Sequence, residues 1–531
     1  MICTASGFAW GGTTAFAYDA LGQAVQDRRI IGANTYTVAY GYDPAGNVRS
    51  ATYPSGRIVA YTRDIQGRIS GITTRQTSGS SAATVVSAAT YKPFGPLASL
   101  SFGNGLGLTL AYDQDYQLTD IDTLSGATVV QDLTYGHDAS GNITAITDHL
   151  TSGRTQAFGY DNLNRLASAS GLYGSLAFTY DGVGNRLTNV VGGTTSAYAY
   201  PSTSNRLSTV TTGANVRSFS YASNGSISDD TRDATHDYGY TFNNASRLVT
   251  AKLNGTTVGS YLYNALEQRA AKTASGSTIQ FVYDSAGHLI EEANASTGAA
   301  VREYIWLDDM PVGLVDDTGA GPVLYYIHAD HLNRPQKITD ASKAVVWDGV
   351  FDPFGNPASI TGTIINPLRF PGQYQDTETA LAQNWFRDYD AMIGRYAESD
   401  PLGLEAGVNT FAYALNNPTK WSDAIGLNGP PAGFRGPSSS SGPSCEEECE
   451  QQLERDEAQC RSLPNGTPSE KGTRSRCWES ANARYGACRA KKPLPPLVTW
   501  RQAVGAAAAG TGIWAILEAI GSAVGGAALA L

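Results

Sequence analysis

The sequence has few charged residues, and it has no long run of lysine or arginine. Charged residues make up 16% of its 531 positions, and the formal net charge is -11. Proteins that bind nucleic acid usually have a strongly basic patch. The composition therefore argues against a nucleic-acid partner for the main body of the chain. A mostly helical chain would have more charge and fewer than the 58 glycines found here, so turn-rich β structure is predicted.

The N-terminus lacks the features of a secretory signal. The first residues, MICTASGFAWGG, include neither a basic region nor an apolar run of the required length. We therefore expect no Sec signal peptide and, for a secreted or cell-surface location, delivery through a specialised secretion system. Because a repeat pattern begins almost at once, we also expect the chain to be the C-terminal piece of a longer protein.

A motif of the form Tyr-Asp-x-x-Gly, followed by Asn or Arg and an apolar residue, recurs through residues 1–300. Clear copies begin at Tyr18, Tyr42, Tyr180 and Tyr283, and degenerate copies at Tyr61, Tyr135, Tyr160, Tyr200 and Tyr240. The period of about 20 residues is typical of stacked repeats. Aspartate accepts a hydrogen bond from the backbone two residues on, and glycine adopts a positive φ, so each copy predicts a hairpin turn. Successive hairpins predict one long antiparallel sheet, with structural rather than glycan-binding tyrosines.

Residues 325–427 contain a distinctive order of motifs. His-Ala-Asp-His and Asp-Pro-Phe-Gly-Asn come first, then Arg-Asp-Tyr-Asp, Gly-Arg-Tyr, Ser-Asp-Pro-Leu-Gly-Leu, Asn-Asn-Pro and a closing Asp-Ala-Ile-Gly-Leu. With the repeats before it, this stretch resembles the core domain of rearrangement-hotspot (RHS) repeat proteins. That family includes polymorphic bacterial toxins and the C component of insecticidal Tc complexes, with teneurins as distant relatives.

The resemblance implies a mainly β fold. The YD repeats of residues 1–300 form an antiparallel sheet that spirals into a shell, and the RHS core domain of residues 301–427 closes it. The chain's own C-terminal tail would then be enclosed. Because the sequence contains only about a dozen repeat units, we expect a partial shell.

The resemblance further implies an aspartyl-protease-like site at which the chain cuts itself. The family's Arg-Asp pair corresponds to Arg387 and Asp388, and its second aspartate to Asp400. The cut would follow the leucine of the closing motif, between Leu427 and Asn428. Two neighbouring carboxylates do not both ionise cheaply, so one acts as acid and the other activates water. We expect Arg387 to bias which aspartate stays charged.

Other interpretations of these residues stay open. Asp388, Asp400 and the reserve candidate Asp390 could be turn or capping residues. Ala424 occupies a position where the family usually has proline. The absence of proline would slow cleavage without preventing it. His328 and His331 lack a third ligand at an informative spacing, so we interpret them as structural. No metal and no cofactor are predicted.

The tail after Leu427 has a different composition. A Gly/Pro/Ser linker, residues 428–444, precedes a segment with five of the six cysteines, residues 445–492. Spacings of eleven residues place Cys449 with Cys460, and Cys477 with Cys488, each pair on one helix face. An antiparallel helical hairpin would join Cys460 to Cys477 and Cys449 to Cys488, although spacing alone does not fix connectivity. A zinc site is the alternative.

Residues 493–531 are a proline spacer followed by an Ala/Gly-rich apolar segment. From residue 504 onward this segment is long enough to span a membrane as a helix, although a buried helix is the competing interpretation. The tail contains no histidine, which argues against common nuclease and peptidase chemistry.

Three functional hypotheses follow. In the first, the chain is the C-terminal part of an RHS-type polymorphic toxin, and its β shell releases a short effector after Leu427. An immunity protein, secretion-system components and a membrane are then candidate partners, and self-cleavage is the only enzymatic activity. In the second, the chain is a non-enzymatic structural or adhesive surface scaffold with a membrane-associating tail. In the third, it is a truncated relic.

Overall fold

The computed structural model describes residues 2–6, 12–93, 95–317, 319 and 321–427, which form an almost entirely antiparallel β structure. One sheet has 33 strands, and a second has four. In the large sheet each strand pairs with the strand before it in the chain, for example β2 with β3 and β32 with β33. The predicted long antiparallel sheet is therefore confirmed. The linker, both cysteine pairs and the apolar segment predicted for the tail lie outside the described residues, as does Asn428.

The first seventeen strands of the large sheet are β1 (Ile2–Ser6), β2 (Thr13–Tyr18), β3 (Ala24–Ile31), β4 (Asn34–Tyr42), β5 (Val48–Thr52), β6 (Ile58–Arg63), β7 (Ile69–Arg75), β8 (Ala83–Tyr91), β9 (Leu97–Phe102), β10 (Gly107–Tyr112), β11 (Leu118–Ser125), β12 (Thr128–His137), β13 (Ile143–Asp148), β14 (Gln156–Tyr160), β15 (Leu166–Gly171), β16 (Gly174–Tyr180) and β17 (Arg186–Val191). The remaining sixteen are β18 (Thr194–Ala199), β19 (Thr209–Thr212), β20 (Asn215–Tyr221), β21 (Ile227–Asp233), β22 (His236–Phe242), β23 (Leu248–Leu253), β24 (Thr256–Tyr263), β25 (Arg269–Ala274), β26 (Ser277–Tyr283), β27 (Leu289–Asn294), β28 (Ala300–Leu307), β29 (Met310–Asp316), β30 (Val323–Ala329), β31 (Pro335–Thr339), β32 (Val345–Phe351) and β33 (Pro357–Gly362). The small sheet contains β34 (Gln373–Gln375), β35 (Ala382–Asn384), β36 (Arg387–Asp390) and β37 (Arg395–Tyr396). Three short 3₁₀ turns are η1 (Ser152–Arg154), η2 (Gly403–Ala406) and η3 (Ala414–Asn416).

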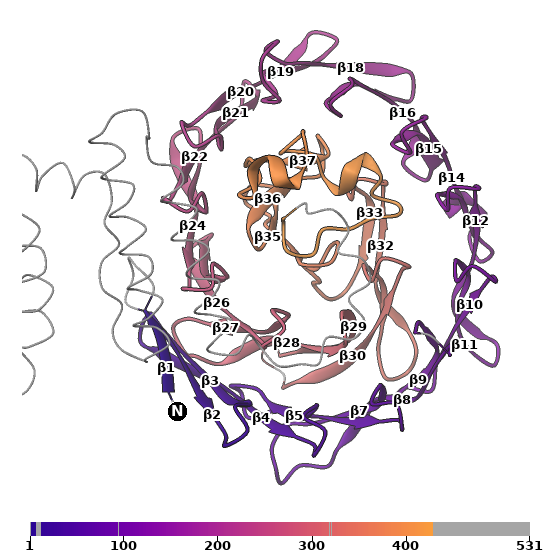
Figure 1. The fold of residues 1–531 in the computed structure, drawn as a ribbon, viewed down its shortest axis with the longest axis vertical. Helices are drawn as coiled ribbons and strands as arrows, with labels where there is room; N and C mark the ends of the chain where they lie inside the picture. Colours follow the sequence, from indigo (N-terminus) through magenta and orange to yellow (C-terminus); the bar gives the residue numbers. More distant parts are fainter. Residues whose placement is uncertain (1, 7–11, 94, 318, 320, 428–531) are drawn as a thin grey trace, which may run out of the picture. The chain divides into compact units, whose positions relative to one another are not determined.

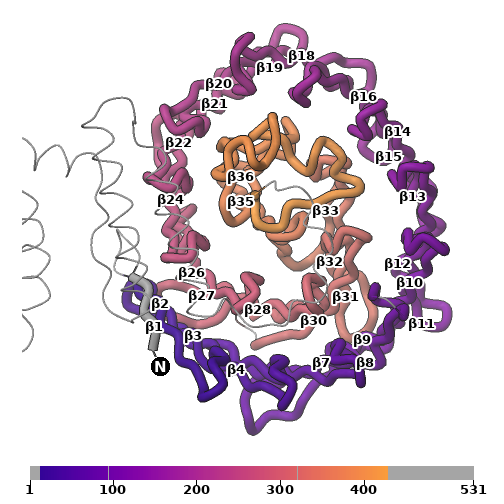
Figure 2. Tube along the Cα trace, viewed as in Figure 1, coloured from indigo at the N-terminus to yellow at the C-terminus, as the bar shows by residue number. Residues whose placement is uncertain are grey.

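The large sheet curls on itself. Strands β2 to β26, which we call the wall, follow a closed curve, and β27 to β30 continue inside its first strands (Figure 1). The Cα trace shows β31 to β36 within this curve (Figure 2). Contacts across the two layers support the arrangement: the Tyr53 hydroxyl donates to the Tyr304 carbonyl at 2.8 Å, and Arg57 pairs with Glu303 at 2.6 Å. The sheet continues past residue 300 to Gly362.

The repeat motif forms the predicted turns. In the copy that starts at Tyr42, Asp43 Oδ1 accepts hydrogen bonds from the backbone N–H groups of Ala45 and Asn47, both at 2.9 Å. Gly46 has a φ of 87° and donates to the Asp43 carbonyl. Tyr42 then lies opposite Val48 on the paired strand, with a one-residue irregularity in register. This is a hairpin whose bulge glycine needs the left-handed conformation.

In several copies the motif tyrosine links its hairpin to the one before it. Its hydroxyl donates to the backbone carbonyl of an earlier strand, as Tyr42 does to Ala24 at 2.7 Å, and Tyr180 to Leu166 at 2.9 Å. Tyr200 and Tyr283 make the same bond, to the carbonyls of Arg186 and Arg269. A buried tyrosine usually finds a hydrogen-bond partner for its hydroxyl while its ring is removed from water, as these residues do. These contacts agree with a structural role for the tyrosines.

The core domain, residues 301–427, contacts the wall through polar side chains far apart in the sequence. Asn417 donates to the side chain of Asn142, and Asn409 to that of Asn185, at 2.9 and 3.0 Å. Both wall asparagines follow the glycine of a repeat motif. Arg154 and Asp348 form a two-armed ion pair at 2.9 and 2.8 Å. Asn417 of the Asn-Asn-Pro motif and Asn409 therefore bind the core domain to the turns of the wall.

Candidate functional site

Arg387 and Asp388, two neighbouring residues of the predicted site on β36, have different surroundings. Side chains alternate between the two faces of a strand. Arg387 and Tyr389 contact the interior of the core domain, where the Tyr389 hydroxyl donates to the Phe354 carbonyl at 2.7 Å. Asp390, two residues after Asp388, pairs with Arg217 of the wall. Arg387 and Asp388 are thus adjacent in the sequence but belong to two separate clusters.

The first cluster, which we call the arginine cluster, consists of Arg387, Asp400 and Asp423. One nitrogen of the Arg387 guanidinium, Nη2, lies 2.8 Å from Asp400 Oδ2 and 3.0 Å from Asp423 Oδ2. The side chains of Arg387 and Asp400 are fully buried. The guanidinium also lies 3.6 Å from the centre of the Tyr396 ring. A planar, permanently charged fork of this kind suits two buried carboxylates better than a lysine would.

The arginine cluster holds the closing segment, residues 423–427. Arg387 Nε donates to the Gly426 carbonyl at 2.6 Å, and Asp423 Oδ1 accepts the Leu427 N–H at 3.0 Å. The Phe386 N–H donates to the Ile425 carbonyl at 3.1 Å. The peptide immediately before the predicted cut is therefore fixed by hydrogen bonds on both sides.

Two glycines permit this close approach. Gly426 has a φ of 70°, and a Cβ there would lie 2.3 Å from the Asn384 carbonyl oxygen. A Cβ on Gly372 would lie 1.7 Å from the Ala424 carbonyl oxygen. Neither position accommodates a side chain, because the obstacles are backbone atoms. Ala424 itself, where the resembled family has proline, is exposed.

The second cluster is a carboxyl pair, Asp388 and Glu398. The Asp388 N–H donates to Glu398 Oε2 at 2.8 Å. The exposed fractions are 3% for Asp388 and 1% for Glu398. Burial raises the pKa of Asp388 to about 6. Burial, with the charge of Asp388 added to it, raises the pKa of Glu398 well above its ordinary value.

Asp390, the reserve candidate, is tied to the wall. Burial alone would raise its pKa, but the guanidinium groups of Arg217 and Arg232 hold the pKa below its ordinary value. Arg217 also binds Asp230 at 2.6 Å. An aspartate that stays ionised between two arginines fastens the core domain in place and is poorly suited to acid catalysis.

The two candidate histidines lie at separate positions in the packing. His328 Nε2 lies 2.8 Å from Thr339 Oγ1, and its ring packs edge-on against Phe102. Burial lowers its pKa to about 3. His331 Nε2 lies 2.8 Å from the Thr419 carbonyl. Among the described residues, no group of three or more potential ligands could hold a metal ion.

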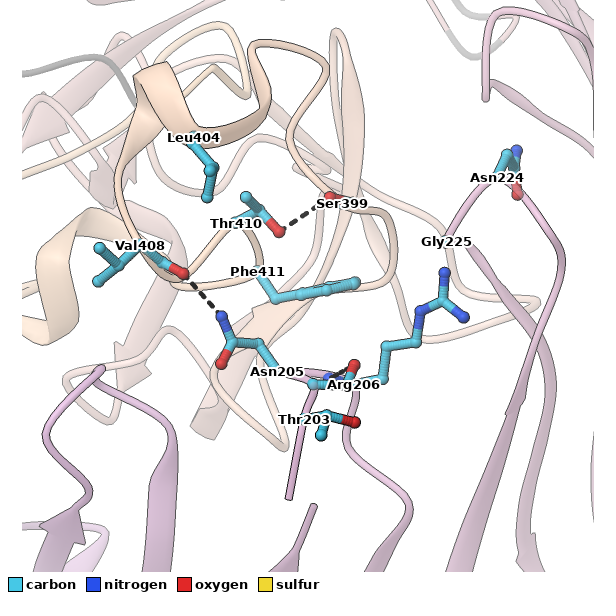
Figure 3. Close-up of a pocket in the computed structure, with 11 residues that line it drawn as sticks. Thr203, Asn205, Arg206, Asn224, Gly225, Ser399, Leu404, Val408, Thr410 and Phe411 are labelled. Atoms are coloured by element: carbon cyan, nitrogen blue, oxygen red, sulfur yellow. Dashed lines mark hydrogen bonds between the residues drawn. The ribbon is translucent and has the colours of Figure 1, made fainter. Parts of the chain in front are cut away.

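A pocket of about 290 Å³ lies where the core domain meets the turns of the wall (Figure 3). Asn205 Nδ2 donates to the Val408 carbonyl at 2.7 Å across this seam, and Ser399 bonds Thr410 at 2.8 Å. Its lining includes Arg206 but none of the carboxylates of the two clusters. The predicted catalytic residues therefore do not line this pocket.

The sequence did not predict two residues of these clusters, Asp423 and Glu398. Asp423 appeared only as the first residue of the closing motif, and Glu398 was not considered. The Asp-x-x-Gly-Leu pattern, in which an aspartate precedes the cut by four residues, was the available signal for Asp423. The separation of ten residues between Asp388 and Glu398 gave no comparable signal, because the two are brought together by the turn between β36 and β37.

Comparison with known proteins agrees with this architecture. The teneurin YD-shell family matches residues 103–420, and the RHS repeat matches residues 18–58 and 42–79. The chain belongs to the teneurin YD-shell family. Within this YD-shell chain, the helices that the structure describes are all too short or too polar to cross a membrane.

Several curated relatives of the YD-shell chain are toxins. Double-stranded DNA deaminase toxin A of Burkholderia cenocepacia is 28% identical over 331 residues, which are 56% of this chain and 22% of that protein. Toxin protein Tse5 of Pseudomonas aeruginosa is 40% identical over 118 residues, or 22% and 9% of the two chains. Toxin subunit YenC2 of Yersinia entomophaga is 25% identical over 479 residues, or 75% and 48%.

Solved structures show the same fold. The Tc holotoxin pore of Photorhabdus luminescens matches with a TM-score of 0.65 at 18% identity, covering 81% of this chain and 24% of that one. A TcdB2-TccC3 crystal structure without its hypervariable C-terminal region gives 0.60 at 19%, covering 79% and 24%. The YD-shell chain thus spans less than half the length of each of these relatives and structures.

Proposed function

We propose that this YD-shell chain is the carrier part of a polymorphic toxin and that it cuts itself between Leu427 and Asn428, with residues 428–531 as the released effector. The observation that supports the cut is the hydrogen bond from Arg387 to the Gly426 carbonyl, made by an arginine that Asp400 and Asp423 hold in place. The toxin relatives support the carrier role. A specialised secretion system would deliver the chain, and an immunity protein would protect the producing cell.

The role proposed for each residue follows from its charge. Asp388, with its pKa raised to about 6, is the acid–base group, because it can hold or release a proton near neutral pH. Arg387 stays positively charged and fixes the peptide before the cut. Asp400 neutralises and orients Arg387, and Asp423 also binds the Leu427 N–H. Fixing the peptide in one geometry removes much of the entropy cost of the reaction.

The test is the intact mass of the purified chain beside an Asp388→Asn, Asp400→Asn double variant. The parent should give two fragments that meet at Leu427–Asn428, and the double variant one uncut chain. A matched control replaces Asp43 and Asp181, two turn aspartates, by asparagine. Asparagine already fills this role at Asn243 and Asn264, whose side chains accept the same turn hydrogen bonds. The control should therefore be cut like the parent.

An uncut parent would contradict the self-cleavage proposal and would leave a scaffold of YD repeats without processing. Cleavage of the double variant at the parent's rate would instead remove these two aspartates from the reaction. Expression of residues 428–531 alone tests the effector role separately, because a passive scaffold predicts no toxicity from them.

A further inference from the structure

Strands β27 and β28 carry two buried glutamates that lie directly opposite each other. The Cα atoms of Glu291 and Glu303 are partners in the register of the two strands. The exposed fractions are 1% for Glu291 and 4% for Glu303. Like charges directly opposite each other on paired strands destabilise a sheet, and burial adds the cost of removing each charge from water. The two glutamates therefore need compensation from outside their own strands.

The turn between β5 and β6, in the wall, contacts both glutamates of the inner strands (Figure 1). Arg57 Nε lies 2.6 Å from Glu303 Oε2, and the Ser55 hydroxyl donates to Glu303 Oε1. Glu291 Oε2 accepts the Ser55 N–H at 3.1 Å. The other oxygen of Glu291, Oε1, is buried, and nothing in the part of the chain that the structure describes hydrogen-bonds to it. Glu303 therefore has a cation as its partner, whereas Glu291 has one neutral donor.

The charges at this contact balance only if one glutamate is neutral. The titratable and charged groups that face the two glutamates are Arg57 and the phenols of Tyr36 and Tyr53. Burial raises the pKa of both phenols, so they stay neutral. Two ionised carboxylates and one guanidinium would leave a buried negative charge, and a buried carboxylate without a cation keeps its proton instead. Burial, with the charge of Glu303 added to it, raises the pKa of Glu291 to about 8.

We propose that Glu291 and Glu303 form a pH-sensitive latch between the two layers of the sheet. The latch is closed while Glu291 carries a proton and loosens when that proton is lost. Loss of the proton places two negative charges opposite each other beside one arginine, and the repulsion falls only when β27 and β28 move away from the turn between β5 and β6. The latch concerns opening of the shell and is independent of self-cleavage, because none of its residues belongs to the arginine cluster or to the closing segment.

The direction of the pH dependence follows from proton linkage. When the layers separate, Glu291 is in water and has the ordinary pKa of a glutamate, about 4.3. When they are joined, its pKa is about 8. The joined form binds the proton more tightly, so the stability that this proton contributes is complete below the lower value and is lost as the pH rises through the higher one. Between the two values, each pH unit should favour the separated form by about tenfold.

The test is hydrogen exchange of the full chain between about pH 6 and pH 8, followed by mass spectrometry in peptides from β5 and β6 and from β27 and β28. Dividing each rate by the intrinsic rate of an unstructured peptide at the same pH leaves the equilibrium between joined and separated layers. In the parent, the separated fraction should rise by at least about 10-fold over this range. Peptides from β18 and β19, whose sequences contain no carboxyl side chain, should show no such rise.

Glu291→Gln keeps this position neutral at every pH and should abolish the rise. Glu292→Gln is the matched control, because Glu292 is equally buried but lies opposite Arg302 in the register and binds it at 3.1 Å. The control should keep the parent's pH dependence, even if its exchange is faster at every pH. A Glu291→Gln variant with the parent's rise would overturn the assignment to Glu291. A parent without the rise in these four strands would overturn the latch, and that result does not depend on whether either variant folds.

Discussion

The wall and the small sheet of β34 to β37 are stabilised by polar contacts of different range. In the wall, the motif aspartate Asp181 binds backbone groups two and four residues away, and the motif tyrosine Tyr180 binds the Leu166 carbonyl about one hairpin back. In the small sheet, Arg387 bonds residues 23, 36 and 39 positions away, and Asp390 reaches a wall arginine 173 positions away. The local contacts of the wall recur in successive hairpins, so one of them can be lost without the others. Each long-range contact of the small sheet has no second copy.

The largest expected effect follows from Arg387→Met. The substitution leaves Asp400 and Asp423 buried without their shared cation, and removing one partner of a buried pair costs about 3–5 kcal/mol. We expect loss of self-cleavage and a lower free energy of unfolding, measured by denaturant titration of the uncut chain. Arg387→Lys keeps the positive charge but loses the planar guanidinium group, so its free energy of unfolding should lie between those of the parent and Arg387→Met. An unchanged free energy of unfolding in Arg387→Met would show that the long-range contacts of the small sheet contribute little to stability.

Gly426→Ala should have the next largest effect. A residue other than glycine pays about 1–2 kcal/mol in the left-handed conformation, and here its Cβ would also meet the Asn384 carbonyl oxygen. The closing segment should leave its position, and cleavage should stop while the wall stays folded. Gly276→Ala in the wall is the matched control, because it has a φ of 77° with no heavy atom within 4 Å of the added Cβ. That variant should be cut normally.

Asp390→Asn tests the seam between the core domain and the wall. Arg217 keeps Asp230 but loses a charged partner, so the free energy of unfolding should fall by about 1–3 kcal/mol. Asp64→Asn removes a carboxylate paired with the partly exposed Arg68 and should cost less than about 1 kcal/mol. Thermal denaturation of both variants makes the comparison. Equal losses would show that the seam contributes no more than a surface pair.

Tyr42→Phe should have the smallest effect. It removes the single hydrogen bond to the Ala24 carbonyl and keeps the ring in place, which costs about 1 kcal/mol. Hydrogen exchange should increase locally at β3 and β4 and stay unchanged in the small sheet. A loss of protection in the small sheet would show that the repeats are coupled more widely than their local bonds suggest.

The same difference in range explains what the sequence could predict. The hairpins around Asp43 and Tyr42 were predictable because all their determinants lie within about two strands, and turn chemistry is local. The pairing of Asp388 with Glu398 was not, because it depends on how β36 and β37 bring separate segments together. The resemblance supplied Arg387, Asp388 and Asp400, but not the division of Arg387 and Asp388 between two separate clusters. The reserve candidate Asp390 shares its motif with Asp388, and only its contact with Arg217 distinguishes the two.

Strictly sequential pairing of the strands has a consequence for the order of assembly. Each strand of the large sheet needs only its predecessor as a template, so the sheet can grow from one end as the chain emerges, whether from a ribosome or from a secretion channel. The small sheet comes last and contacts wall strands made some 170 residues earlier, such as β20 through Arg217. Its buried charges find their partners only when those strands are already in place. The proposed cleavage site can therefore be completed only after the earlier part of the chain has folded.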